Sequence, residues 1–241
     1  MPIKGVLFDF SGTLFRIESV AEWLRAVLDA RGTAVEQAGF EDWTRRLTEA
    51  GALPGGPVPA RIPPSLAVAW ADRDRNAPAH REAYTGLARQ ADLPDPGVYD
   101  ALYDRHMSPA AWRPYPDAAE VLGGLRSSGT AVGIVSNIGW DLRPVFRAHG
   151  LDACVDAYVL SYEHGVQKPD PRLFRTACTL LELDPADVVM VGDDRHADAG
   201  AAAVGCEVRF VDHLPVAERP DGLRALGLPE LTGEASVTYR S

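Results

Sequence analysis

The stretch VLFDFSGTL, Val6 to Leu14, places a carboxylate at the end of a short apolar run. Such runs, bounded by a turn, are typical of strands buried on both faces of a parallel sheet. In open parallel α/β sheets, ligands bind beyond the carboxyl ends of the strands, where loop amides and helix N-termini converge. Gly12 permits a sharp turn after Asp9, and Thr13 adds a hydroxyl. The stretch therefore predicts an active site after a first strand over Ile3 to Phe10.

A strand end of this kind is, by itself, often only a turn. Three later stretches favour a site, and each follows or adjoins a short apolar run: IVSN at 134–137, QKPDP at 167–171 and VGDDRHAD at 191–198. Together the four stretches resemble the four-motif signature of the haloacid dehalogenase superfamily, from Asp9 to about Gly205. One position departs from that pattern, because most phosphatases of the superfamily carry a second Asp where this chain has Ser11.

Composition limits the classes of partner and compartment. The 241 residues carry a formal net charge of -10, which argues against a nucleic-acid or membrane-surface partner. No run of about 18 apolar residues is present, and the N-terminal run is too short for a signal peptide. The three cysteines are an odd set without metal-ligand spacing, and we interpret them as core residues of a reducing compartment. We expect a cytoplasmic protein.

A helical block is predicted between the first strand and the second. Ser19 and Glu22 form a capping box before an amphipathic run, and a second run precedes a loop rich in Pro and Gly over residues 51–64. Further helices are expected at 65–75, 79–91 and 97–106, with His80 and His106 at the surface. Such a block interrupts the alternation of strands and helices. The resemblance implies that residues 16–107 form a cap that selects the substrate.

The alternation resumes after this block. Strands are predicted at 131–136, 154–160, 188–191 and 207–211, and helices at 117–128, 141–149, 171–183 and 198–204, with one short helix near 223–226. This order predicts an α/β fold with a doubly wound, Rossmann-like parallel sheet. Residues 1–15 and 108–241 are expected to form the catalytic core, and residues 16–107 an inserted all-helical cap.

The motif residues can meet in one cleft if each lies at a strand end. Asp9 is the candidate nucleophile, since a carboxylate can attack phosphorus and form an aspartyl-phosphate. Lys168, one of only two lysines in the chain, can stabilise the developing negative charge. Catalytic roles are therefore predicted for Asp9, Ser136 and Lys168, and substrate contacts for Ser11, Gly12, Thr13 and Asn137.

A second cluster of carboxylates follows the strand at 188–191. Asp193, Asp194 and Asp198 bring like charges close together, which is unfavourable unless a cation is bound, and Mg²⁺ prefers such oxygen ligands. The resemblance implies that Asp9, the carbonyl of Ser11 and Asp193 bind Mg²⁺ directly, with Asp194 or Asp198 acting through water. The alternative is that Asp194 and Asp198 only solvate the loop and cap the following helix.

Three functions remain open. The leading hypothesis is a Mg²⁺-dependent phosphatase that acts on a small phosphorylated metabolite. The resemblance also admits a metal-free 2-haloacid dehalogenase, whose first motif likewise lacks the second Asp, although Ser11 stands where those enzymes usually have an aromatic residue. The third hypothesis is a binding protein that kept the fold without turnover.

Overall fold

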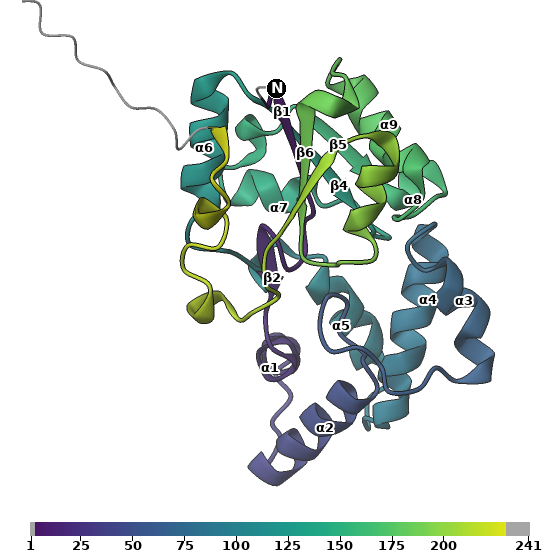
Figure 1. Cartoon of the computed structure of the whole chain (residues 1–241). Helices are drawn as coiled ribbons and strands as arrows, with labels where there is room; N and C mark the ends of the chain where they lie inside the picture. The colour runs from purple at the N-terminus through teal and green to yellow at the C-terminus, as the bar shows by residue number, and fades with distance from the viewer. Residues whose placement is uncertain (1–2, 230–241) are drawn as a thin grey trace, which may run out of the picture.

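A computed structural model of the chain describes residues 3–229 and contains a five-stranded parallel sheet with helices on both faces (Figure 1). The strand order is β5-β4-β1-β6-β7, so the first strand lies at the centre. The register places Phe8 beside Ile134 and Val191. The strands are β1 (Gly5–Phe8), β4 (Ala131–Ser136), β5 (Ala157–Leu160), β6 (Val188–Gly192) and β7 (Glu207–Phe210). The predicted Rossmann-like α/β core is confirmed.

The alternation of side chains along β1 divides the core between the two faces of the sheet. Val6 and Phe8 pack into the larger cluster, together with α6 (Ala118–Ser128) and α7 (Arg143–Ala148). Leu7 packs on the opposite face against α9 (Pro171–Leu180). Both faces of β1 are therefore buried, which is why the strand has a continuous apolar sequence.

Helices α1 to α5 lie together beyond one end of the sheet (Figure 1). They are α1 (Val20–Ala30), α2 (Gln37–Glu49), α3 (Ala67–Asp72), α4 (Ala77–Ala88) and α5 (Gly97–His106). The capping box predicted for Ser19 and Glu22 is present at the start of α1. The Pro- and Gly-rich loop is non-helical up to a 3₁₀ turn at Pro64–Leu66.

A two-stranded antiparallel ribbon joins the two parts of the chain. It pairs β2 (Phe15–Ile17) with β3 (Trp112–Pro114), with Arg16 opposite Arg113. The sequence does not predict this ribbon, because three residues are too few for a recognisable alternation. Its position means that the chain leaves and re-enters the sheet domain through adjacent strands.

The prediction that His80 and His106 lie at the surface is wrong. Both rings are buried: they stack on each other at 5.4 Å, and Nδ1 of His80 lies 2.7 Å from the hydroxyl of Tyr103. Burial lowers the pKa of His106 to about 3 and that of His80 well below its usual value, so both rings are neutral at pH 7. Trp140, which follows β4, packs edge-on against the ring of His106 at 5.5 Å.

Smaller differences from the predictions concern the type of one helix, an additional short helix and the burial of one cysteine. The segment over Asp198–Val204 is a 3₁₀ helix, Ser161–His164 forms a short helix α8, and a 3₁₀ turn spans Arg224–Leu226. Cys178 and Cys206 are core residues as predicted, whereas Cys154 is partly exposed. Within residues 3–229, none of the helices is long and apolar enough to cross a membrane.

Candidate active site

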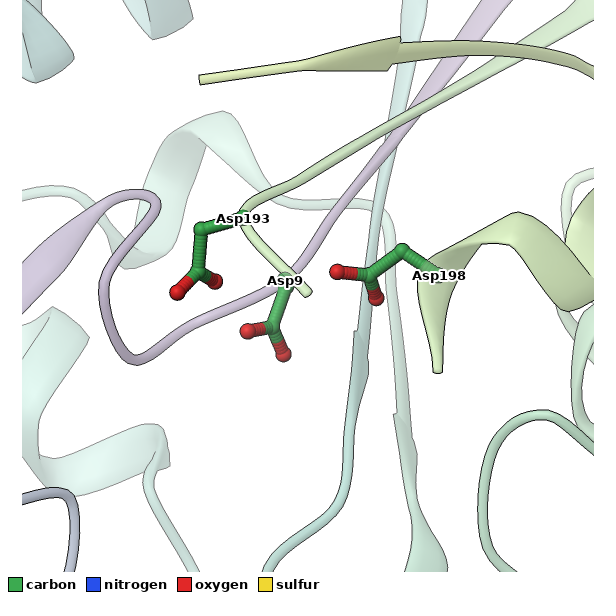
Figure 2. A group of neighbouring side chains, drawn as sticks. All are labelled: Asp9, Asp193 and Asp198. Carbon is green, nitrogen blue, oxygen red and sulfur yellow. The ribbon is translucent and has the colours of Figure 1, made fainter. Parts of the chain in front are cut away.

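Asp9 follows β1 directly, at the carboxyl end of this central strand. Its backbone N–H donates to the carbonyl of Val191 at 2.9 Å. Figure 2 shows its carboxylate beside those of Asp193 and Asp198. Lys168 lies between two of these groups. Its Nζ donates to Oδ1 of Asp9 at 2.8 Å and to Oδ1 of Asp198 at 2.6 Å, and its side chain is 2% exposed. The structure thus brings the residues of three separate motifs into direct contact.

The buried ion pairs set the charge of this cluster. Burial raises the pKa of Asp9 to about 7, and Lys168 opposes that increase while Asp198 and Asp193 add to it. Burial by itself disfavours the ammonium of Lys168, but Asp9 and Asp198 outweigh it and raise the pKa of Lys168 above its usual value. Lys168 therefore stays protonated at pH 7, and its charge keeps a substantial fraction of Asp9 ionised.

Asp193 is held by two side chains on the other side of Asp9. Oδ1 accepts a hydrogen bond from Thr13 at 3.1 Å, and Oδ2 lies 2.5 Å from Nδ1 of His213. Burial raises the pKa of Asp193, but its hydrogen bond and charge interaction with His213 prevail, so this pKa lies below the usual range. Asp193 is therefore ionised at pH 7.

Two glycines make room for the carboxylates. Gly12 has φ +83°, and a Cβ there would lie 2.4 Å from Oδ2 of Asp193. A Cβ at Gly192 would lie 2.0 Å from Oδ2 of Asp198. A larger residue at either position must displace a carboxylate of the site, which explains why glycine occupies both positions.

Asn137 acts on Lys168 in this structure. Its Oδ1 accepts from the backbone N–H of Lys168 at 2.6 Å, and its Nδ2 donates to the carbonyl of the same residue at 3.0 Å. Both ends of the amide therefore fix the backbone that carries the ammonium. Ser136 is buried at the end of β4, one residue earlier. The predicted substrate contact of Asn137 stays a prediction, but its side chain already has a positioning role.

The other predicted site residues differ in what they contact. Asp194 is exposed, and its Oδ1 accepts from the backbone N–H groups of His196 and Ala197. These bonds fix the loop before the 3₁₀ helix, and the predicted water-mediated role of Asp194 at Mg²⁺ stays a prediction. Asp198 does not cap the helix; it binds Lys168 and accepts from the N–H of Asp194. Ser11 lies close to Gly55: a Cβ added at Gly55 would lie 2.9 Å from the Oγ of Ser11.

Two residues at the site have no local signal in the sequence. His213 lies in the loop after β7, and Arg219 lies in a C-terminal stretch without clear periodicity. Nη1 of Arg219 donates to the carbonyl of Gly12 at 2.6 Å, and Nη2 donates to the carbonyl of Thr13. Arg219 thus fixes the loop that carries the nucleophile. Neither contact can be predicted without the tertiary fold.

The donor set fits a divalent cation. One oxygen from each of Asp9, Asp193 and Asp198 lies within 4.8 Å of the other two. Lys168 offsets only part of their negative charge, and a carboxylate oxygen that accepts one hydrogen bond keeps a second lone pair. Mg²⁺ is commonly held by one or two carboxylates and several waters. Asp9 is the least engaged of the three, since only its Oδ1 has a hydrogen-bond partner within residues 3–229, whereas both oxygens of Asp193 and of Asp198 already have partners.

Comparison with known proteins agrees with this arrangement. A family model for haloacid dehalogenase-like hydrolases matches residues 3–205, which include all four motifs. The chain belongs to this family. The chain is thus a hydrolase by family, and its parallel sheet with a buried Asp-Lys pair is the core of a haloacid dehalogenase-like hydrolase.

The relatives of this hydrolase include both dehalogenases and phosphatases. It is 30% identical over 211 residues to (S)-2-haloacid dehalogenase 4A of Burkholderia cepacia, covering 84% of this chain and 80% of that one. It is 34% identical over 147 residues to ribulose-1,5-bisphosphate 5-phosphatase of Halopiger xanaduensis, covering 56% and 59% of the two chains. The L-2-haloacid dehalogenase structure from Xanthobacter autotrophicus superposes with a TM-score of 0.60 at 26% identity, covering 92% of this chain and 83% of that one.

Proposed function

We propose that this hydrolase is a Mg²⁺-dependent phosphatase of small phosphorylated metabolites. The observation that supports the proposal is the grouping of the carboxylates of Asp9, Asp193 and Asp198, with one lysine that pairs with Asp9 and Asp198. With one ammonium for three carboxylates, the site is too negative for an anionic substrate alone. A divalent cation corrects that balance and supplies a Lewis acid for the phosphoryl oxygens.

Asp9 performs the first step in this proposal. Lys168 binds Oδ1, which leaves Oδ2 as the attacking atom. The Oδ2–phosphorus bond forms as the ester P–O bond breaks, and the departing alkoxide takes a proton from water or from the substrate. Water then hydrolyses the aspartyl-phosphate, which releases inorganic phosphate and restores the carboxylate. Lys168 and the hydroxyl of Ser136 stabilise the charge on the phosphoryl oxygens.

We further propose that residues 16–107 act as the cap of this enzyme, with residues 1–15 and 108–241 as its core. Three contacts support that role. Gly55 lies against Ser11, His80 packs against Gly139, and the hydroxyl of Ser161 donates to the carbonyl of Asp74. The helical segment therefore covers the nucleophile loop and the turn after β4, where it can select the group attached to the phosphate.

A dehalogenase is the second candidate. Two (S)-2-haloacid dehalogenases, which match 84% and 85% of this chain, support it. In that reaction Oδ2 of Asp9 attacks the carbon that carries the halogen, halide leaves with the bonding electrons, and water hydrolyses the resulting ester. The existing Lys168–Asp9 pair can serve this chemistry without a metal. A 2-haloacid is itself a carboxylate, however, and three nearby carboxylates oppose its binding.

The test is a panel of phosphomonoesters and 2-haloacids, assayed for phosphate and halide release with Mg²⁺ and with excess chelator. The phosphatase proposal expects phosphate release that requires Mg²⁺ and is lost in Asp9→Asn. Halide release that is undiminished by chelator contradicts it and supports the dehalogenase. Binding of Mg²⁺ without release of either product indicates a non-catalytic member of the family.

A further inference from the structure

A second pocket, of about 760 Å³, lies outside the catalytic cluster. It is lined by residues of the helical segment, such as Thr44, Thr48 and Leu53, and by sheet-domain residues such as Pro116 and Val216. None of Asp9, Lys168, Asp193 and Asp198 lines it. Its size falls within the range of small-molecule sites, about 300–1,000 Å³.

Two arginines line this pocket, and Arg16 is the one without an ion pair among the described residues. Nη1 donates to the carbonyl of Gly55 at 3.1 Å, and the side chain is partly buried. Within residues 3–229, no carboxylate lies at ion-pair distance from its guanidinium, whereas the neighbouring Arg105 and Arg113 pair with Glu18 and Glu22. Arg16 therefore presents a positive charge and several N–H donors for which the described protein supplies no anion.

The other charged groups that line the pocket are already neutralised. Glu18 receives two hydrogen bonds from Arg105, at 2.7 and 2.6 Å. Glu22 binds Arg113 at 2.7 Å as well as Ser19 of the capping box. The pocket thus keeps one net positive charge, located at Arg16.

The hydroxyl groups that line the pocket already donate hydrogen bonds within the protein. The hydroxyl of Thr44 donates to the carbonyl of Phe40 at 2.8 Å, and that of Thr48 donates to the carbonyl of Thr44 at 2.7 Å. The hydroxyl of Ser19 donates to Glu22. The rest of the wall is largely aliphatic or proline, including Ile17, Val20, Leu53, Pro57, Pro116 and Val216. A ligand that fits has one anionic group and an apolar body.

We propose that this pocket is a binding site for a small amphipathic organic anion, whose carboxylate or other anionic head pairs with Arg16. Such a ligand contacts the helical segment and the sheet domain together, so it holds the two parts in the arrangement seen here. The proposal is independent of the reaction at Asp9, because the pocket has its own cation and its own walls.

Calorimetric titration of the full-length Asp9→Asn variant with sodium octanoate tests this site without turnover. Octanoate is expected to bind, and 1-octanol to bind at least about tenfold more weakly, since a charged hydrogen bond contributes about 1.5–3 kcal/mol. Arg16→Gln in the same background should weaken octanoate binding to a similar degree. Arg224→Gln is the matched control, because it removes one arginine charge from an exposed pair with Glu120 and does not line the pocket.

Two further variants locate the ligand. Thr48→Phe, on the half-buried face of α2, fills the pocket and should reduce octanoate binding without removing a charge. Lys168→Met should leave it within about twofold. If Lys168→Met abolishes binding while Arg16→Gln does not, the anion sits in the catalytic cluster and the proposal is wrong. Equal affinity for octanol and octanoate, or no binding of octanoate, also overturns it.

Discussion

Lys168 and Asp9 form a buried ion pair in which Nζ lies 2.8 Å from Oδ1. The pair joins the strand end after β1 to a loop far along the chain. Because burial raises the pKa of Asp9 to about 7, the protonation of this carboxyl in the metal-free protein changes near neutral pH.

Metal binding should therefore release a proton from Asp9. A carboxyl with a raised pKa is protonated below pH 7 and ionised above it, and a cation binds only the ionised form. We expect release of about half a proton per Mg²⁺ at pH 7, approaching one at pH 6 and almost none at pH 9, from the fraction protonated at each pH. Calorimetry in buffers of different ionisation enthalpy measures it. Asp9→Asn is the control and should release none, and zero release from wild type at pH 6 contradicts the prediction.

Asp9→Asn should abolish turnover and leave the fold intact, since a neutral amide is a poor nucleophile. The side chain is isosteric, and Lys168 keeps its contact with Asp198. Initial rates and thermal unfolding of both proteins measure the two effects. Activity within tenfold of wild type is incompatible with Asp9 as the nucleophile.

Asp193→Asn should weaken Mg²⁺ binding and lower turnover, because it removes a charge from the carboxylate group. Asp194→Asn is the matched control, with the same change at an exposed residue outside that group, and should bind Mg²⁺ within a few-fold of wild type. Calorimetric Mg²⁺ titration and phosphate release decide the outcome. Equal losses in the two variants contradict the assignment.

Arg219→Ala should lower the free energy of unfolding by about 2 kcal/mol or more, since it leaves the buried carbonyls of Gly12 and Thr13 without these donors. Turnover should fall as well, because the loop that carries Asp9 is no longer fixed. Arg224→Ala is the control: its pair with Glu120 is exposed, so its loss should cost at most about 0.5 kcal/mol. Urea unfolding of both variants measures the difference, and equal effects count against a special role for Arg219.

Ser11 should make phosphatase activity depend on the leaving group. A second Asp in this position acts as general acid, typically worth about 10²- to 10⁴-fold, and a serine hydroxyl cannot replace it. Wild type is expected to hydrolyse aryl or acyl phosphates faster than alkyl phosphates. Rates across esters of graded leaving-group pKa should show a steep dependence that flattens in Ser11→Asp.

The close approach of Gly55 to Ser11 sets a condition on that variant, because the longer side chain must fit beside this loop. Ser11→Asn is the steric control: it adds similar bulk without an acid and should not raise alkyl-phosphate hydrolysis. A flat dependence in wild type means that another acid is already in place.

The sequence alone determined the order of the five strands of the parallel sheet and of the longer helices, because each depends on local features. The apolar run before Asp9 predicts a buried strand, the capping box at Ser19 starts α1 where expected, and Gly129 ends α6 with a positive φ. The four motifs also identified the family. The proposed roles of the site residues and the domain boundaries stay predictions for the experiments above.

The tertiary structure decided the contacts that join distant parts of the chain. Arg219 reaches the carbonyl of Gly12 across 207 positions, and His213 reaches Asp193 from the loop after β7. His80 and His106 are buried by neighbours from other elements. Asn137 binds the backbone of Lys168. No periodicity or motif encodes these pairings, because each depends on how the sheet and its covering helices pack in space.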